Sequence, residues 1–324
     1  MPDISSKRGV YFSANDAVYD WTVAFLNSYR RFNPDLPLFL IPFNEECKRL
    51  RCLQSEYDFR IYTHPTFSQL EAIGEAFELG HTPTGPYWFR RYASFWGPLD
   101  EFMYLDARQL VLTNLEPYVK APREHGFDLL HYDCALNQVY RPGPLRRKMV
   151  RQHQARGFNA GRWASRQGLF SMKEFEKIAE DALEVRNQLH HRNTDQAFFN
   201  YCCDTQPVNY GHFAEVLGDI CQQGWANQPG HVYEEDNTYR LWNCGGLDHT
   251  EQVILIHWAG ISNRRIIPER RWYLKYRYLR SSQITYLLAS IIMFVVSLPD
   301  VLLRKIRQQR HINQLYHHFF RRDS

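Results

Sequence analysis

The sequence predicts an α/β fold built on a mostly parallel sheet that is flanked by helices. Short apolar runs recur along the chain, helical patterns separate them, and polar side chains follow where several of the runs end. Strands that alternate with helices form largely parallel sheets, and such sheets bind ligands outside the carboxyl ends of their strands. A length of 324 residues and a hydrophobic fraction of 44% fit one large domain or two ordinary ones.

The first third of the chain supplies three predicted strands, at residues 9–15, 36–43 and 59–64. After the first strand, apolar and small side chains recur at helical spacing until Asn33 and Pro34 end the pattern, which predicts a helix. Two further helices are predicted at residues 67–80 and 87–100, the second one broken at Gly97 and Pro98.

The stretch EFMYLDA, residues 101–107, predicts a buried fourth strand that delivers one carboxylate, Asp106, to its end. Asn15 and Asp16 follow the first strand in the same way, so all three side chains are expected at one edge of the sheet. The later predicted elements are strands at residues 127–133 and 252–260 and an amphipathic helix at residues 171–189.

The formal net charge of +4 conceals an uneven distribution. Residues 264–324 contain 13 Lys or Arg and three acidic residues, a net charge of +10, so the remainder carries −6. A weakly acidic body with a basic tail does not have the composition of a nucleic-acid-binding protein. An anionic membrane surface is the electrostatic partner that such a tail suits.

The seven cysteines are odd in number, irregularly spaced and without a C-x-x-C pair. This pattern argues against a disulfide framework and against a structural zinc site. The first residues lead almost directly into a strand and show no signal-peptide pattern. Together these features predict a protein of the reducing cytoplasm.

Residues 284–303 are the most apolar stretch of the tail, but Pro299 and Asp300 interrupt it. The uninterrupted run of 15 residues is short for a membrane span. Aromatic and cationic side chains are interleaved over residues 270–282, as in segments that lie in a membrane interface. We therefore expect residues 266–324 to form a basic, apolar helical tail that is peripheral on the inner face of a membrane. A helix packed against the rest of the chain is the alternative.

Five short segments follow one another in the order SANDAVYDWTVAFLNSYRR (13–31), RRYASFWGPLDEFMYLDARQLVL (90–112), GFNAGRWASRQGLFS (157–171), NTDQAFFNY (193–201) and HWAGISNRR (257–265). Together they resemble the GT-A glycosyltransferases, nearest the family of glycogenin and the bacterial lipopolysaccharide galactosyltransferases. The resemblance implies a Rossmann-like GT-A domain over residues 1–265, with a nucleotide-sugar donor.

The resemblance also implies roles for single residues in binding the nucleotide part of the donor. Asn15 and Asp16 would meet the base and ribose. A basic residue would approach the diphosphate, and we favour Arg90 for it without excluding Arg91. Asp106 would bind a metal ion or the ribose.

The remaining segments would hold the donor sugar and the reacting carbon. The residues that cup the sugar would be Asn159, Ala160 and Gly161. Asp195 and Gln196 would act beside the reacting carbon, as in the related retaining enzymes. His257 and Gly260 would close on the diphosphate, and Arg264 would replace a lysine that the family has at position 263.

Arg108 departs from the family pattern, which has a second aspartate at this position. One interpretation is that Arg108 pairs with the diphosphate and makes a metal ion less necessary. Another is that Asp106 and His257 still hold Mn²⁺ or Mg²⁺ with diphosphate oxygens and water. A third is that the site has decayed and Arg108 faces solvent.

Each of these residues also has a plain structural interpretation. Asp106 could cap the turn after its strand, and Asn-x-Gly sequences often form turns. Asp195 could cap a helix, and a lone histidine such as His257 is more often structural than a ligand. Two adjacent arginines on a helix commonly form a solvated face.

We predict a glycosyltransferase that moves a hexose from a nucleotide donor, with a uridine diphosphate sugar expected, to a glycan or lipid-linked acceptor with retention of configuration. A nucleotidyltransferase is the alternative within enzymes, because it shares the α/β plan. A catalytically inactive protein that binds sugar nucleotides or glycans is the alternative outside enzymes, and Arg108 suggests it.

Overall fold

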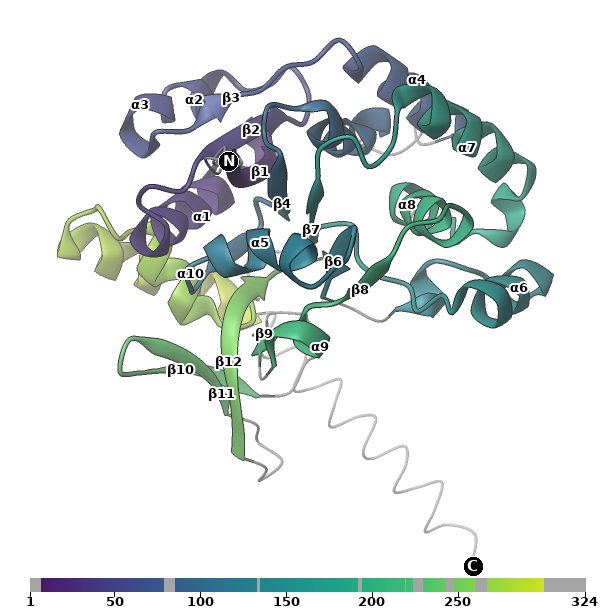
Figure 1. Ribbon diagram of the computed structural model, residues 1–324. Coiled ribbons are helices and arrows are strands. Elements are labelled where there is room, and N and C mark those ends of the chain that lie inside the picture. Colours follow the sequence, from purple (N-terminus) through teal and green to yellow (C-terminus); the bar gives the residue numbers. More distant parts are fainter. Residues whose placement is uncertain are drawn as a thin grey trace, which may run out of the picture.

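The structure of the protein, a computed structural model, confirms the predicted α/β fold. It describes residues 7–78, 85–132, 135–191, 194–218, 220–223, 230–242, 248–259 and 267–299. Helices cover both faces of a central sheet (Figure 1).

The main sheet has seven strands in the order β3–β2–β1–β4–β7–β6–β8. Strands β3 to β4 in this order are parallel, β7 is antiparallel to both of its neighbours, and β8 is parallel to β6. Their bounds are β1 Arg8–Ala14, β2 Leu38–Pro42, β3 Arg60–Ile61, β4 Glu101–Asp106, β6 Leu129–His131, β7 Arg162–Arg166 and β8 Tyr210–His212.

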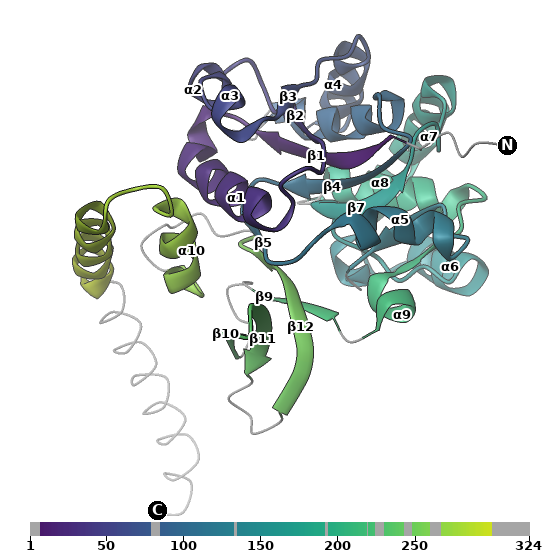
Figure 2. The ribbon, with the colours of Figure 1, turned by 60° about the vertical axis from the view of Figure 1, so that its left-hand side comes forward.

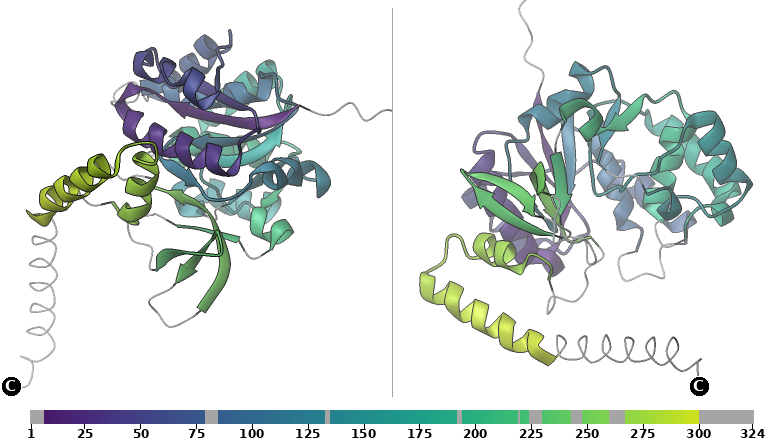
Figure 3. Two further views of the ribbon diagram at one scale, coloured as in Figure 1. Left: turned by 90° about the vertical axis from the view of Figure 1, so that its left-hand side faces the viewer. Right: turned by 90° about the horizontal axis from the view of Figure 1, so that it is seen from below.

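Successive side chains of β1 point into two different cores, as the pleat of a strand requires. Tyr11 packs on the face covered by α4, α7 and α8, whereas Phe12 packs with Phe25 on the face of α1 and α5. The views from the side and from below show these two helical layers (Figure 3). The helices are α1 Tyr19–Phe32, α2 Lys48–Arg51, α3 Gln54–Tyr57, α4 Phe67–Ala76, α5 Glu116–Glu124, α6 Pro144–His153, α7 Met172–Glu184, α8 Thr194–Thr205, α9 Phe213–Leu217 and α10 Arg270–Arg277.

A smaller sheet has the order β10–β11–β12–β5, and β9 also pairs with β12. Its strands are β5 Gln109–Val111, β9 Ile220–Gln223, β10 His231–Glu235, β11 Thr238–Trp242 and β12 Asp248–His257. β4 belongs to the main sheet and β5 to the smaller one, so the chain changes sheets within Ala107 and Arg108. The segment singled out from the sequence therefore lies at the junction of the two sheets.

Residues Gly85–Trp96 form a 3-10 helix, η3, where the sequence predicted a helix at residues 87–100. Side chains three residues apart lie above one another in such a helix. Phe89, Tyr92 and Phe95 form one row of this kind, and all three are fully buried. The three-residue spacing of this apolar row therefore matches the three residues per turn of the helix.

Helix α10 lies at the start of the predicted tail but packs on the body of the protein. The ring of Tyr273 packs at a tilt against Trp21 of α1, with the ring centroids 4.5 Å apart, and Asn27 of α1 donates a hydrogen bond to the Tyr276 carbonyl at 2.9 Å. Arg277 forms an ion pair with Asp20 at 2.8 Å. The folded unit therefore continues past residue 266 through α10.

Residues 283–299 form one further helix, which extends beyond α10 and away from the main sheet (Figure 2). No helix among the described residues is both long enough and apolar enough to cross a membrane.

Candidate functional site

Two adjoining cavities open at the carboxyl edge of the main sheet and share Trp88, Asp106 and Arg108 as walls. The larger, of about 350 Å³, lies at the ends of β1 and β2 and has Asn15, Phe43 and Asn44 among its lining residues. The smaller, of about 190 Å³, is lined by Trp88, Arg91, Asp106, Arg108, Asn159, Ala160, Gly161, Asp195, Gln196, His257 and Ala259. Eight of the predicted site residues therefore line one small cavity, although they come from segments far apart in the sequence.

Asp106 ends β4 with its side chain at the cavity wall. Its Oδ1 accepts a hydrogen bond from the Tyr104 hydroxyl at 2.9 Å. Its backbone N–H donates to the Gly161 carbonyl at 2.9 Å, and the Gln109 side chain donates to the same carbonyl at 2.8 Å. A Cβ atom on Gly161 would lie 2.6 Å from Asp106 Oδ2, so only glycine allows this close approach.

Arg91 is the buried cation of the smaller cavity. It donates to the Ala160 carbonyl at 2.7 Å, and its Nη2 lies 3.6 Å from a carboxylate oxygen of both Asp106 and Asp195. Its guanidinium lies 4.8 Å from the Trp88 ring centroid. One guanidinium thus bridges two carboxylates beside the segment that was predicted to cup the sugar.

Arg90 does not line either cavity. Its side chain is bound by Glu71 at 2.5 Å and by Glu45 at 2.8 Å, and it lies over the rings of Phe67 and Tyr87. Adjacent residues of a 3-10 helix point about 120° apart because the helix has three residues per turn. The structure therefore gives the place at the cavity to Arg91, the alternative to Arg90.

Asn15 and Asp16 have different surroundings. Asn15 lines the larger cavity and donates to the Asn44 side chain at 3.1 Å. The Asp16 carboxylate instead accepts from the backbone N–H groups of Arg49 and Leu50 at 2.9 and 3.1 Å. Asp16 thus caps α2, and Asn15 is the member of the pair that faces the cavity.

Helix α8 positions the segment of Asn159 and Gly161. The Asn159 Oδ1 accepts from the Gly161 N–H at 2.8 Å, and its Nδ2 donates to Gln196 at 3.1 Å. Asn200, four residues after Gln196 and nearly fully buried, donates to the Phe158 carbonyl and accepts from the Phe158 N–H, both at 2.8 Å. The sequence analysis did not assign Asn200, although its spacing from Gln196 places both on one helical face.

Asp195 lies in the first turn of α8 and within the cavity. Burial raises the pKa of its carboxyl group, while the Arg91 guanidinium lowers that pKa and the Asp106 carboxylate raises it. The ionisation of Asp195 therefore depends on both Arg91 and Asp106.

His257 ends β12, which pairs with β5 so that His257 lies opposite Gln109. The adjacent Trp258 N–H donates to the Arg108 carbonyl at 3.0 Å. Burial holds the pKa of His257 well below its usual value, and the guanidinium groups of Arg162, Arg108 and Arg91 lower it further. His257 is therefore a neutral imidazole among arginines.

Arg162 is a second residue that the sequence analysis did not assign. It begins β7, directly after Gly161, it is almost fully buried, and its guanidinium contacts the Nδ1 of His257. Its position between Gly161, which was predicted to cup the sugar, and Trp163 was the signal that could have indicated it.

Among the described residues, no group of three or more His, Cys, Asp or Glu side chains could hold a metal ion. Asp106 and His257, the two predicted ligands, do line the same cavity. Gly260 and Arg264, which were predicted to close on the diphosphate, lie outside the described residues.

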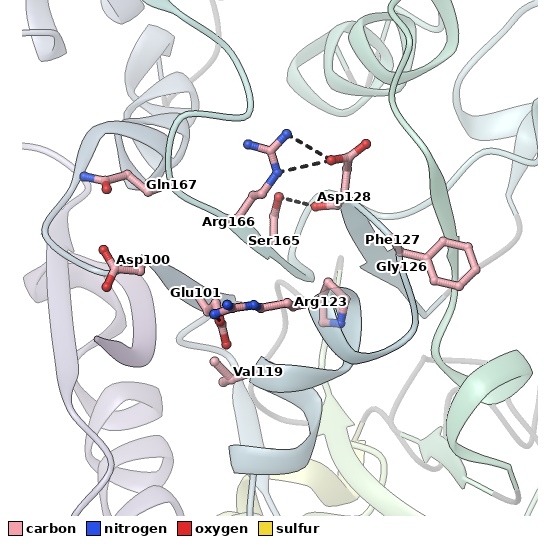
Figure 4. Close-up of a pocket in the computed structure, with 11 residues that line it drawn as sticks. Asp100, Glu101, Val119, Arg123, Gly126, Phe127, Asp128, Ser165, Arg166 and Gln167 are labelled. Atoms are coloured by element: carbon pink, nitrogen blue, oxygen red, sulfur yellow. Dashed lines mark hydrogen bonds and ion pairs between the residues drawn. The ribbon is translucent and has the colours of Figure 1, made fainter. Parts of the chain in front are cut away.

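Another cavity, of about 610 Å³ and thus bigger than the two at the carboxyl edge, lies at the opposite edge of the sheet (Figure 4). Four of its five charged lining residues form ion pairs with one another. Glu101 binds Arg123 at 2.7 Å, and Asp128 binds Arg166 at 3.0 Å. It contains none of the predicted site residues.

Comparison with known proteins identifies the fold. The structure is similar to LgtC, with a TM-score of 0.54 and 13% identity in a complex of that galactosyltransferase with donor and acceptor sugar analogs, covering 85% of this chain and 96% of that one. An active-site mutant of LgtC gives a TM-score of 0.52 at 15% identity, covering 80% of this chain and 89% of that one. The bifunctional glycosyltransferase WbbM gives 0.51 at 15% identity over 86% of this chain, which spans half of the WbbM chain. The sequence matches no protein-family model and no curated protein.

The protein therefore has the GT-A glycosyltransferase fold that the sequence resemblance implied. The smaller cavity lies where ligands bind such α/β sheets, outside the carboxyl ends of the strands.

Proposed function

We propose that the protein is a glycosyltransferase that transfers a hexose from a nucleotide-diphosphate sugar to an acceptor hydroxyl. One observation carries the proposal. In a chain with the GT-A fold, Arg91, Asp106, Asn159 and Asp195 line one cavity at the carboxyl edge of the sheet, although four separate segments supply them.

In this proposal the donor extends across both cavities. The base and ribose occupy the larger one beside Asn15 and Phe43, and the sugar occupies the smaller one beside Asn159 and Gly161. Arg108 borders both cavities, so the diphosphate that joins the two parts of the donor would pass it. A uridine diphosphate sugar is the proposed donor on the strength of the sequence resemblance.

The chemistry requires positive charge where the leaving diphosphate gains negative charge. Arg91 and Arg108 provide such charge from the protein itself. Asp195 and Gln196 would act at the reacting carbon, in the cavity that holds the sugar. We propose retention of configuration and a glycan or lipid-linked acceptor, by extension from the family that the sequence resembles.

A thermal-shift screen of nucleotides and nucleotide sugars tests donor binding. UDP at a hundred times its dissociation constant should stabilise the protein by about 2.7 kcal/mol. Turnover should release uridine diphosphate from the donor that binds. Release of pyrophosphate would instead indicate a nucleotidyltransferase, and binding without turnover over a panel of acceptors would indicate an inactive binding protein.

We also propose that helix 283–299 attaches the protein to an anionic membrane surface. The helix contacts α10 through Arg270, which donates to Ser297 at 3.0 Å. Much of its remaining surface is apolar and exposed, at Ile284, Leu287, Leu288, Ile291, Ile292, Phe294 and Val295. The net charge of +10 over residues 264–324 complements anionic headgroups, which argues for a membrane rather than a protein partner.

Sedimentation with vesicles that contain phosphatidylserine tests this attachment. Full-length protein should sediment with the vesicles at low salt, and a double variant, Leu288→Glu with Ile292→Glu, should not. Val150→Glu, at an exposed apolar residue of α6, is the matched control and should sediment as the wild type does. Wild-type protein that stays in the supernatant at low salt would contradict the proposal.

A further inference from the structure

The contact between Arg162 and His257 fixes how the histidine can act. Arg162 begins β7 and His257 ends β12, so two strands from different sheets bring the side chains together. The guanidinium Nη1 of Arg162 lies against the Nδ1 of His257. Both side chains are almost fully buried, so solvent does not compete for this contact.

The direction of the hydrogen bond follows from the chemistry of its partners. A guanidinium stays protonated in proteins and has no acceptor atom. Nδ1 of His257 must therefore accept, and it needs its lone pair to do so. A neutral imidazole carries its one proton on the other nitrogen, so Nε2 of His257 is an N–H donor.

This tautomer does not fit a metal ligand. A histidine that binds a metal through Nε2 carries its proton on Nδ1 and donates it to a carboxylate, a carbonyl or water. At His257 the group beside Nδ1 is itself a donor, which is the opposite polarity. Of the two predicted metal ligands, only Asp106 keeps an oxygen that could coordinate a cation. Its carboxylate already accepts a hydrogen bond from Tyr104 and lies 3.6 Å from Arg91.

We propose that this cavity binds the nucleotide diphosphate directly, through Arg108, Arg91 and the Nε2–H of His257, without a bridging divalent cation. Arg162 is the positioning residue that keeps His257 a hydrogen-bond donor. The inference rests on the proposed function, because it takes the ligand to be a nucleoside diphosphate. It selects the first of the three interpretations that the sequence left open for Arg108.

The wild-type tautomer can be observed directly. Long-range ¹H–¹⁵N spectra of protein labelled at histidine should show His257 protonated at Nε2 alone, with its signals assigned by their loss in His257→Gln. Protonation at Nδ1 alone would overturn the inference, whatever the protein binds.

Nucleotide affinity supplies the second readout. Calorimetric titration with UDP should give dissociation constants in EDTA and in manganese that agree within about twofold. Binding that needs manganese, with a difference of about tenfold or more, would overturn the inference and leave the proposed function standing. Absence of UDP binding under both conditions would overturn the proposed function itself.

Two variants and a matched control separate the roles of the arginines. Arg162→Met removes the donor at Nδ1, so the spectrum should gain the other tautomer and UDP binding should become stronger in manganese. Arg166→Met changes the other end of the same strand, where Arg166 pairs with Asp128, and should alter neither readout. Arg108→Asp restores a second carboxylate and should make UDP binding steeply dependent on manganese, so indifference of this variant to the ion would count against the inference.

Discussion

The two ends of β4 present carboxylates in opposite ways. At the amino end, Glu101 is bound by Arg8 and by Arg123, each at 2.7 Å, and each of its oxygens has its own arginine. At the carboxyl end, Asp106 shares one guanidinium, that of Arg91, with Asp195 at 3.6 Å from each. The cavity at the amino end is larger than either cavity at the carboxyl end, yet its charged side chains already have partners within the protein.

If the carboxyl end holds the donor, as we propose, cavity size alone does not locate the site. Short, direct ion pairs leave little electrostatic attraction for a ligand, and breaking them to admit one has a cost. Charges that are close together but not in hydrogen-bond contact remain available to new partners. The carboxyl end combines such charges with buried arginines and a neutral histidine, which suits an anionic ligand.

The largest expected effect comes from neutralising a carboxylate at the carboxyl end, and the same change at the amino end is the control. Asp195→Asn should lower turnover by about 10²–10³-fold and change donor affinity little, because the proposed function places this group near the reacting carbon. Gln196→Ala should act in the same sense. Asp128→Asn, at the amino end, should leave turnover unchanged. Steady-state kinetics with the donor that binds would measure this, and normal turnover with earlier melting in Asp195→Asn would favour a purely structural cap.

Asp204 sharpens the comparison because its buried carboxyl group has hydroxyl partners instead of arginines. The hydroxyls of Tyr140 and Tyr210 both donate to it. Burial raises its pKa to about 6, although these two hydrogen bonds lower it. The stability that this group contributes is therefore full below the unfolded pKa near 4 and is lost as the pH rises through 6.

Between pH 4 and pH 7 the free energy of unfolding should fall by about 2 kcal/mol more in the wild type than in Asp204→Asn. Urea unfolding at the two pH values measures this difference. Asp128→Asn changes a carboxylate that has an arginine partner, and this control should show the same fall in the free energy of unfolding as the wild type. Equal pH dependence in the wild type and Asp204→Asn would show that Asp204 is not protonated in this range.

The smallest expected effect distinguishes two adjacent arginines. Arg91→Lys loses the planar contacts to Ala160 and Trp88, so UDP affinity should fall about tenfold, or about 1.4 kcal/mol. Arg90→Lys should lower stability by weakening the pairs with Glu45 and Glu71 but should leave the affinity within about twofold. Calorimetry on both variants decides between them, and the reverse result would give the donor contact to Arg90.

Strands with continuous apolar runs were predictable from the sequence. β1, β2 and β4 appear within one or two residues of their expected bounds, because buried parallel strands need such runs. β7 was missed because its sequence, RWASR, begins and ends with arginine. Its place between β4 and β6 buries Arg162 while Arg166 stays exposed, and no local pattern encodes that difference.

The sequence predicted which residues line the cavity better than it predicted how they are arranged. The motifs indicated Asp106, Asn159, Gly161, Asp195 and Gln196, and the structure brings them to one cavity. The sequence could not show which of two adjacent arginines faces it, because that depends on how the helix packs against the rest of the protein. It also could not show the role of Arg162, which depends on a strand some 95 positions away in the sequence.

Strand β12 has a consequence for how the protein can move. Its earlier residues pair with β11 and β9, and Leu255, Ile256 and His257 pair with β5, which follows Asp106 by only two residues. All of these pairs lie within the smaller sheet, so a rigid-body swing of that sheet would keep them. The swing would instead break the hydrogen bond from the Gln109 side chain to the Gly161 carbonyl and the contact of His257 with Arg162. A movement of one sheet against the other would therefore displace Gly161 and His257, which line the smaller cavity, so the relative position of the two sheets and the shape of that cavity change together.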